Sequence, residues 1–391
     1  MDFELSEQQK LIRKEVRKLA DIYGPEYWRE KDKKREYPKE FVAELAKAGW
    51  FGTVISEEYG GAGLGVTEGS IVLEELTASG AGLDGSNACH AVYFVSHPLV
   101  KHGTEEQKKK YLPKIATGEL RFQALAITEQ EAGFDTTKIR TFAEKKGDHY
   151  AINGKKVFIS RVAESDLMLL VARTTSLEKA PRKTKGLSLF IVDLRDAGNS
   201  IKRRRIDMMT RHAVDTNELF ITDLEVPSEN LLGQEGEGLY HLMDGLNPER
   251  IYIAAECIGL GRLALERAVE YAKERVVFDR PIGQNQGIQF PLAEAYADIE
   301  LADLMRYKAA TLYDKGLPCA KESNIAKLSA SQAAFNATNQ AVQTFGGYGL
   351  AEDYDVERFF RDARLMLIAP ISTEMVLNYI GEHVLGLPRS Y

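Results

Sequence analysis

The chain has 391 residues, enough for two or three domains. Its 51 Lys and Arg against 58 Asp and Glu give a net charge of −7, which argues against non-specific nucleic-acid binding, because no cation excess can displace phosphate counterions. Three scattered cysteines without a CxxC pair argue against a disulfide framework and a zinc site. Without an apolar signal-peptide core or a run of 18 apolar residues, we expect a cytoplasmic protein with no membrane span and no metal.

The first zone, residues 1–120, is predicted to be an α-helical domain. Ser6 and Gln9 form a capping-box pattern ahead of apolar residues at helical spacing, and Pro38 opens another helical stretch. The glycine-rich run at 57–65 lacks the strand and helix that a nucleotide-binding fingerprint needs on either side. His90 and His97 lie in an apolar stretch, where core or cleft histidines are favoured over a metal pair.

The second zone, residues 121–230, is predicted to be a β-barrel or sandwich. Its apolar or alternating runs span 122–127, 149–152, 156–159, 167–173, 187–192 and 218–221. Turn residues separate them, and Asn153-Gly154 between two runs predicts a hairpin. The basic run 202–205 is interpreted as a solvated edge or a salt-bridge face.

The third zone, residues 231–391, is predicted to be helical again. Long amphipathic or buried patterns cover 251–274, 290–313, 323–345 and 356–368, and a last helix is expected near 373–385. The fold class is therefore α+β multidomain: an N-terminal α-helical domain, a central β-domain and a C-terminal four-helix bundle.

Two segments of the β-rich zone lie at the ends of predicted strands and carry side chains that suit a ligand. Residues 126–136 (AITEQEAGFDT) form either a polar ligand loop or a surface turn. Residues 152–161 (INGKKVFISR) place Phe158 two residues before Ser160. A flavin needs stacking on its ring face and a donor at its redox edge, which this pair could supply, although Phe158 alone also suits a core.

Two segments of the C-terminal zone carry groups that suit phosphate. Residues 274–289 (ERVVFDRPIGQNQGIQ) include Arg275, whose planar guanidinium can bind phosphate through two hydrogen bonds. Residues 343–364 (QTFGGYGLAEDYDVERFFRDAR) include Gly346 and Gly347, which either cap a helix or allow close approach of a pyrophosphate.

In order and spacing, these four segments resemble the acyl-CoA dehydrogenase family, and the resemblance covers the whole chain. It implies FAD as the cofactor and a homotetramer in which one subunit contributes to its neighbour's FAD site. The FAD contacts that it implies are Ile127 and Thr128 at the pyrimidine ring, Phe158 and Ser160 at the isoalloxazine, Arg275 at the pyrophosphate, Phe278, Gln286 nearer the adenosine, and Gln343, Gly346 and Gly347.

Dehydrogenation of an acyl thioester requires a base for the α-proton, and a desolvated carboxylate can serve. In most of the family the base is a Glu shortly after the RDA segment, where this chain has Pro370. Isovaleryl-CoA and long-chain dehydrogenases carry it on an earlier helix before an Arg, a pattern that Glu249-Arg250 matches. The resemblance thus implies Glu249 as the base and Arg250 as a substrate contact, with Glu374 in reserve.

The residues around Glu249 support two interpretations. The following run IYIAAECIGLG is apolar nearly all round, so the helix is expected to be buried and the carboxylate partly desolvated. Alternatively, Glu249 is a first-turn residue behind Asn247 as the N-cap and Pro248. We favour the base.

Two positions depart from the family pattern. Pro370 has no N–H to polarise the thioester carbonyl, so either a neighbour such as Ile371 donates or activation is weaker. Phe134 replaces a Ser that usually binds an FAD phosphate.

The leading hypothesis is therefore an FAD-dependent acyl-CoA dehydrogenase of fatty-acid β-oxidation that passes electrons to an electron-transfer flavoprotein. The alternatives are an acyl-CoA oxidase or a thioester lyase on the same fold, and a non-catalytic protein that binds FAD or acyl-CoA.

Overall fold

The first helix begins at the capping box that the sequence predicts. In the computed structural model, which describes residues 4–390, the Ser6 side chain accepts from Gln9 N at 3.2 Å, and Gln9 Oε1 accepts from Ser6 N at 3.0 Å. The glycine-rich run begins with a short 3₁₀ turn (Glu57–Tyr59) and leads into a helix without a preceding strand, as expected. The helices are α1 (Glu7–Ala20), α2 (Pro25–Lys34), α3 (Lys39–Lys47), α4 (Val66–Leu76), α5 (Gly82–His102) and α6 (Glu105–Ala116).

The second zone forms one eight-stranded mixed sheet. Its path runs β6-β7-β3-β2-β4-β5-β8, and β1 pairs in parallel with β4. The strands are β1 (Phe122–Ala126), β2 (Phe142–Lys146), β3 (His149–Ser160), β4 (Leu167–Arg173), β5 (Leu187–Asp193), β6 (Ile201–Arg205), β7 (Thr216–Pro227) and β8 (Leu231–Leu232). The basic run lies on the exposed edge strand β6, which confirms the solvated edge.

The hairpin predicted at Asn153-Gly154 is wrong, because both residues lie inside β3, where the register with β7 shifts. Asn153 pairs with Asp223 across this irregularity: Asn153 Nδ2 donates to Asp223 Oδ1 at 3.0 Å, and Asp223 N donates to Asn153 Oδ1 at 2.8 Å. A Cβ on Gly154 would lie 2.3 Å from Thr141 Oγ1, so this position needs glycine for close approach rather than for a turn.

The third zone is helical, as predicted. It contains α7 (Gly238–Met243), α8 (Leu246–Glu274), a hairpin of β9 (Val276–Val277) and β10 (Arg280–Pro281), α9 (Gln286–Asp314), α10 (Ala320–Phe345), α11 (Val356–Met366) and α12 (Thr373–Tyr379). Small side chains allow the long helices to approach closely: α10 buries Ala326, Ala330, Ala333, Ala334, Ala337 and Ala341. The helix–β–helix order predicted from the sequence is thus confirmed.

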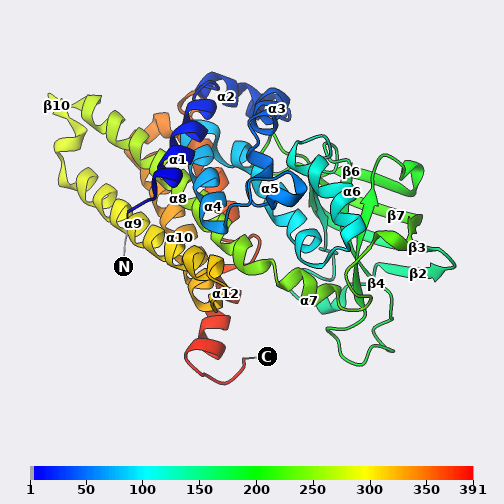
Figure 1. Cartoon of the computed structure of the whole chain (residues 1–391). Helices are drawn as coiled ribbons and strands as arrows, with labels where there is room; N and C mark the ends of the chain where they lie inside the picture. Colours follow the sequence, from blue (N-terminus) through cyan, green and yellow to red (C-terminus); the bar gives the residue numbers. More distant parts are fainter. Residues whose placement is uncertain (1–3, 391) are drawn as a thin grey trace.

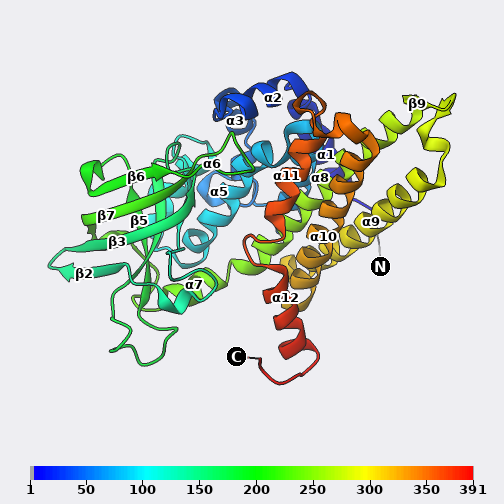
Figure 2. The ribbon, with the colours of Figure 1, turned by 180° about the vertical axis from the view of Figure 1, so that it is seen from behind.

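The arrangement separates the sheet from the β9–β10 hairpin. The strands lie at one end of the molecule and the hairpin at the opposite end, with α5 and the start of α8 between them (Figure 1). The reverse view shows the same separation (Figure 2). Helix α5 is therefore placed to contact both the sheet and the bundle.

Candidate active site

Glu249 lies in the first turn of α8, where its side chain is 6% exposed. Its Oε2 lies 2.7 Å from His90 Nε2 on α5. The proposed cap at Asn247 is wrong: Gly245 is the N-cap residue, and the Asn247 side chain instead accepts from Arg250 Nη1 at 3.2 Å. The carboxylate is thus buried and held by a histidine.

His90 continues the contact on its other side. His90 Nδ1 lies 2.8 Å from Glu256 Oε2, and Ser86 Oγ donates to Glu256 Oε1 at 2.7 Å. Burial alone would lower the pKa of His90, but the charges of Glu249 and Glu256 outweigh it and raise the pKa to about 10. His90 is therefore a buried histidine held between two carboxylates.

The end of β3 presents an aromatic ring and a hydroxyl. Phe158 has a φ of 59° within a register shift between β3 and β7, and its side chain is 57% exposed. The Ser160 hydroxyl lies 3.1 Å from Thr216 Oγ1 and accepts from Arg211 Nη2 at 3.5 Å. An exposed aromatic on a bulged strand is unusual for a core residue and suits contact with a ligand.

Arg161 joins this strand end to the helix that carries His90. Its Nε donates to the Gln123 carbonyl at 2.9 Å, and its Nη1 donates to Asn87 Oδ1, one turn before His90 on α5. Burial and the neighbouring charge of Arg211 lower the pKa of Arg161 to about 10, and Glu249 is among the acidic groups that oppose them. The structure therefore brings Glu249 and the Phe158–Ser160 strand end together around α5.

The loop that carries Ile127 and Thr128 is fastened to the same strand. The Thr128 carbonyl accepts from Val157 N at 2.9 Å, and the Ile127 carbonyl accepts from Lys156 Nζ at 2.8 Å. Lys156 is also paired with Glu129 at 2.9 Å, and both are buried. Burial alone would raise the pKa of Glu129, but Lys156 and hydrogen bonds from Thr141 and Arg140 bring it below its usual value.

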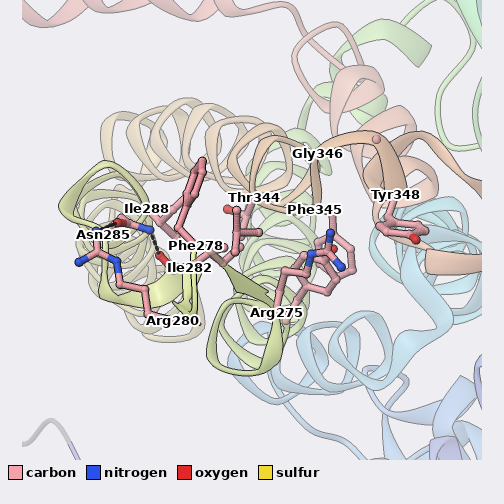
Figure 3. Close-up of a pocket in the computed structure, with 13 residues that line it drawn as sticks. Arg275, Phe278, Arg280, Ile282, Asn285, Ile288, Thr344, Phe345, Gly346 and Tyr348 are labelled. Atoms are coloured by element: carbon pink, nitrogen blue, oxygen red, sulfur yellow. Dashed lines mark hydrogen bonds between the residues drawn. The ribbon is translucent and has the colours of Figure 1, made fainter.

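A second cluster gathers the predicted phosphate-binding residues. Arg275, Phe278, Gly346 and Gly347 line a pocket of about 790 Å³ together with residues of the β9–β10 hairpin and Tyr348 (Figure 3). The Arg275 guanidinium lies 5.9 Å from the centre of the Tyr348 ring. Nothing lies within 4 Å of a Cβ built on Gly346 or Gly347, so their backbone is open to a ligand. Gln286 and Gln343 are exposed beside this pocket without lining it.

Within one chain the two clusters stay apart. Ile127, Thr128, Phe158, Ser160 and Glu249 lie around α5, whereas the second cluster lies near the hairpin at the far end of the bundle (Figures 1 and 2). Their chemistry fits two parts of FAD. An exposed ring beside a hydroxyl suits an isoalloxazine, and a guanidinium beside open glycine backbone suits a pyrophosphate.

The residues that depart from the family pattern lie near the surface. Pro370 and Glu374 are exposed, and Phe134 is 52% exposed. Lys327 Nζ donates to the carbonyls of Met366 at 2.8 Å and Ile371 at 2.7 Å, which fixes the segment around Pro370. Because Glu374 is exposed and Glu249 is buried, only Glu249 has the desolvated setting expected of a base.

Residues 4–390 contain neither a cluster of metal-ligating side chains nor a helix that could span a membrane. No group of three or more His, Cys, Asp or Glu side chains there could hold a metal ion. No helix in the same range has both the length and the apolar composition that crossing a membrane requires.

Sequence reasoning missed the partners of the predicted residues. These partners are the His90–Glu256 pair, Arg161 and the Glu129–Lys156 ion pair. The available signal was a charged residue inside an apolar run, as in AAECIG around Glu256.

Comparison with known proteins agrees with this geometry. Three family models match in chain order: the acyl-CoA dehydrogenase N-terminal domain at residues 6–119, the middle domain at 124–224 and the C-terminal domain at 236–385. The acyl-CoA dehydrogenase fadE12 of Mycobacterium bovis is 41% identical, with 99% of this chain and 98% of that protein covered.

Solved structures agree over the same length. Butyryl-CoA dehydrogenase from Megasphaera elsdenii is 35% identical with a TM-score of 0.90, covering 98% of this chain and 100% of that one. The FAD complex of PigA is 26% identical with a TM-score of 0.92, covering 99% and 100%. The chain therefore belongs to the acyl-CoA dehydrogenase family.

Proposed function

We propose that this protein is an FAD-dependent acyl-CoA dehydrogenase in which Glu249 removes the α-proton of the acyl thioester. The observation that carries the assignment is the buried Glu249 carboxylate, which shares one junction around α5 with the exposed Phe158 ring and the Ser160 hydroxyl. FAD, when bound, supplies the acceptor for the hydride from the β-carbon. The product is the trans-2-enoyl-CoA.

Each side chain has a role that its setting supports. His90 engages one oxygen of Glu249, Oε2, and we assign the other, Oε1, to take the proton. Phe158 would pack against the flavin ring, and Ser160 would donate at its redox edge. Arg250 is half-buried one residue after the base and is assigned to the substrate. Pro370 cannot donate to the thioester carbonyl, so we assign that role to the N–H of Ile371, a residue whose own carbonyl accepts from Lys327 Nζ at 2.7 Å.

The experiment that tests this function is an anaerobic titration of the purified flavoprotein with saturated acyl-CoAs of increasing chain length. We expect the flavin absorbance to bleach with one class of chain length and the enoyl-CoA to accumulate in equal amount. A bound flavin that no saturated acyl-CoA bleaches would favour the non-catalytic or lyase alternatives. Rapid reoxidation by air without another acceptor would identify an oxidase. An electron-transfer flavoprotein is the acceptor that we propose for the dehydrogenase.

We further propose a homotetramer with shared cofactor sites. The two halves of the FAD site lie apart within one chain, and Phe278 at the tip of the hairpin is 93% exposed. Helix α9 also exposes large apolar side chains, namely Phe290, Tyr296, Leu301 and Leu304. A neighbouring copy would cover these residues and bring Arg275 to the flavin held by its Phe158 and Ser160.

A complementation experiment tests the shared site. Arg275→Ala and the double variant Phe158→Ala/Ser160→Ala are each expected to lose most bound FAD, because each removes one half of the contacts. When the two are co-expressed and the mixed oligomers purified, about a quarter of the sites should combine two intact halves and regain FAD. No recovery would place each FAD site within one chain. Arg267→Ala is the matched control, since Arg267 lies on α8 but does not line the pocket.

The compartment that we propose is the cytoplasm. Cys89, Cys257 and Cys319 are buried free thiols, which suits a reducing environment.

A further inference from the structure

Four buried polar side chains form a continuous series of contacts that ends at the proposed base. From Ser86 the contacts run to Glu256 at 2.7 Å, on to His90 at 2.8 Å and then to Glu249 at 2.7 Å. None of the four is more than 6% exposed. Burying polar side chains in this way lowers the stability of the protein unless every one of their contacts is a good hydrogen bond.

The two contacts of His90 fix the number of protons that Glu249, His90 and Glu256 hold together. A neutral imidazole has one N–H and one bare nitrogen, so it can donate to only one carboxylate. Both ring nitrogens of His90 face a carboxylate oxygen. Both contacts are hydrogen bonds only when one additional proton is present, which gives Glu249, His90 and Glu256 together a charge of −1.

The surroundings favour keeping that proton on the ring. The two carboxylates face His90 from α8, and their charges raise its pKa to about 10 against the opposing effect of burial. The other titratable groups that interact with these carboxylates are Arg250, Tyr252 and Cys257 on α8, Cys89 on α5 and Arg161 after β3. The Tyr252 ring lies 6.2 Å from the His90 ring, between centroids.

We propose that His90 is a positioning residue that, as an imidazolium shared between Glu249 and Glu256, keeps the base ionised and fixes its orientation. This inference rests on the proposed role of Glu249. Glu249 and Glu256 lie two turns apart on α8. Without the imidazolium, both of their carboxylates would point into the same buried site with no cation between them. Their repulsion and burial would make Glu249 take a proton from solvent, which would stop it from accepting one from the substrate.

The proton transfer balances in this arrangement. The α-carbon–hydrogen bond breaks and its proton goes to Glu249, which becomes neutral. The electron pair of that bond forms the α,β double bond as the β-carbon gives up hydride to the acceptor. The three groups then carry a charge of 0, with the imidazolium still bonded to Glu256. Glu256 thus holds the ring in place when Glu249 loses its charge.

Two variants test the proposal in the holoenzyme. In Glu256→Gln, the amide oxygen can still accept from His90 Nδ1 while the charge is gone, so the pKa of His90 should fall by at least about one unit. The measurement is an NMR titration with ¹³C-labelled histidine, in which the His90 signal is the one missing from His90→Gln. We expect an imidazolium at pH 8 in the wild type and a ring that titrates at lower pH in Glu256→Gln.

The second variant is read through the pH profile of flavin reduction by acyl-CoA. In His90→Gln, Glu249 loses its cationic partner, so the acidic limb of kcat should move up by at least about one pH unit, with a smaller change in KM. The matched control is His102→Gln on the same helix, where His102 contacts Asp244 at 2.9 Å and lies about 18 Å further along. Its profile should follow the wild type.

The positioning role of His90 and the base role of Glu249 are overturned by different results. A neutral His90 ring at pH 7 in the wild type, or an unchanged pH profile in His90→Gln, would overturn the positioning role even if Glu249→Gln is inactive. Turnover that survives Glu249→Gln would instead remove the proposed base. If His90→Gln does not fold or retain FAD, the His90 signal is identified as the one that remains after each of the other six histidines has been substituted in turn, and the titration of Glu256→Gln against the wild type decides.

Discussion

Glu249→Gln is expected to slow flavin reduction by a saturated acyl-CoA by about 10²–10⁴-fold, because the amide cannot accept the α-proton. The substitution preserves the size of the side chain, and the amide oxygen can still accept a hydrogen bond from His90 Nε2. FAD content and acyl-CoA affinity should therefore stay within a few-fold of the wild type. Anaerobic stopped-flow measurement of flavin bleaching separates the chemical step from binding.

Glu374→Gln is the matched control for this prediction. Glu374 is the reserve base from the sequence, but it is exposed in the first turn of α12, where contacts with its own backbone and with Ser372 lower its pKa. We expect its rate to remain close to the wild-type rate. If Glu374→Gln lost the activity and Glu249→Gln kept it, the two assignments would be exchanged.

Local sequence signals predicted the elements well where local chemistry decides the structure. The capping box at Ser6 and Gln9 and the long bundle helices are of this kind. The hairpin at Asn153-Gly154 failed because a long-range partner decides that position. Asp223 on β7 bonds the Asn153 side chain, and the chain continues as one strand. The actual turn from β2 to β3 occurs at the neighbouring Lys146-Gly147-Asp148.

The same limit applies to the candidate site. Motif spacing named Glu249 and the residues predicted to contact the flavin, each within one segment of the chain. It could not name their partners, because His90 lies 159 residues from Glu249 and 166 from Glu256. A buried charge in an apolar helix indicates that a partner exists, but only the packing of α5 on α8 identifies which one.

Lys156→Met is expected to destabilise the protein by about 3–5 kcal/mol and to lower its FAD content, because it leaves the Glu129 carboxylate buried without its cation. The lysine also bonds the Ile127 carbonyl at 2.8 Å, so its loss frees the loop that carries Ile127 and Thr128. Urea unfolding gives the free energy, and the flavin-to-protein absorbance ratio gives the cofactor content. Excess FAD should recover part of the stability, since the ligand binds only the folded state.

The double variant Glu129→Gln/Lys156→Met separates the lost charge pair from the lost packing. Thr141 donates its hydroxyl to Glu129 Oε1 at 2.6 Å, and the amide oxygen of the substituted side chain can still accept this bond while no charge stays buried. We therefore expect the double variant to be more stable than Lys156→Met alone. Lys47→Met removes the exposed pair with Glu44 and should change the free energy of unfolding by less than about 1 kcal/mol. If Lys156→Met unfolded at the same urea concentration as Lys47→Met, the Glu129–Lys156 ion pair would not be what holds the loop of Ile127 and Thr128 on β3.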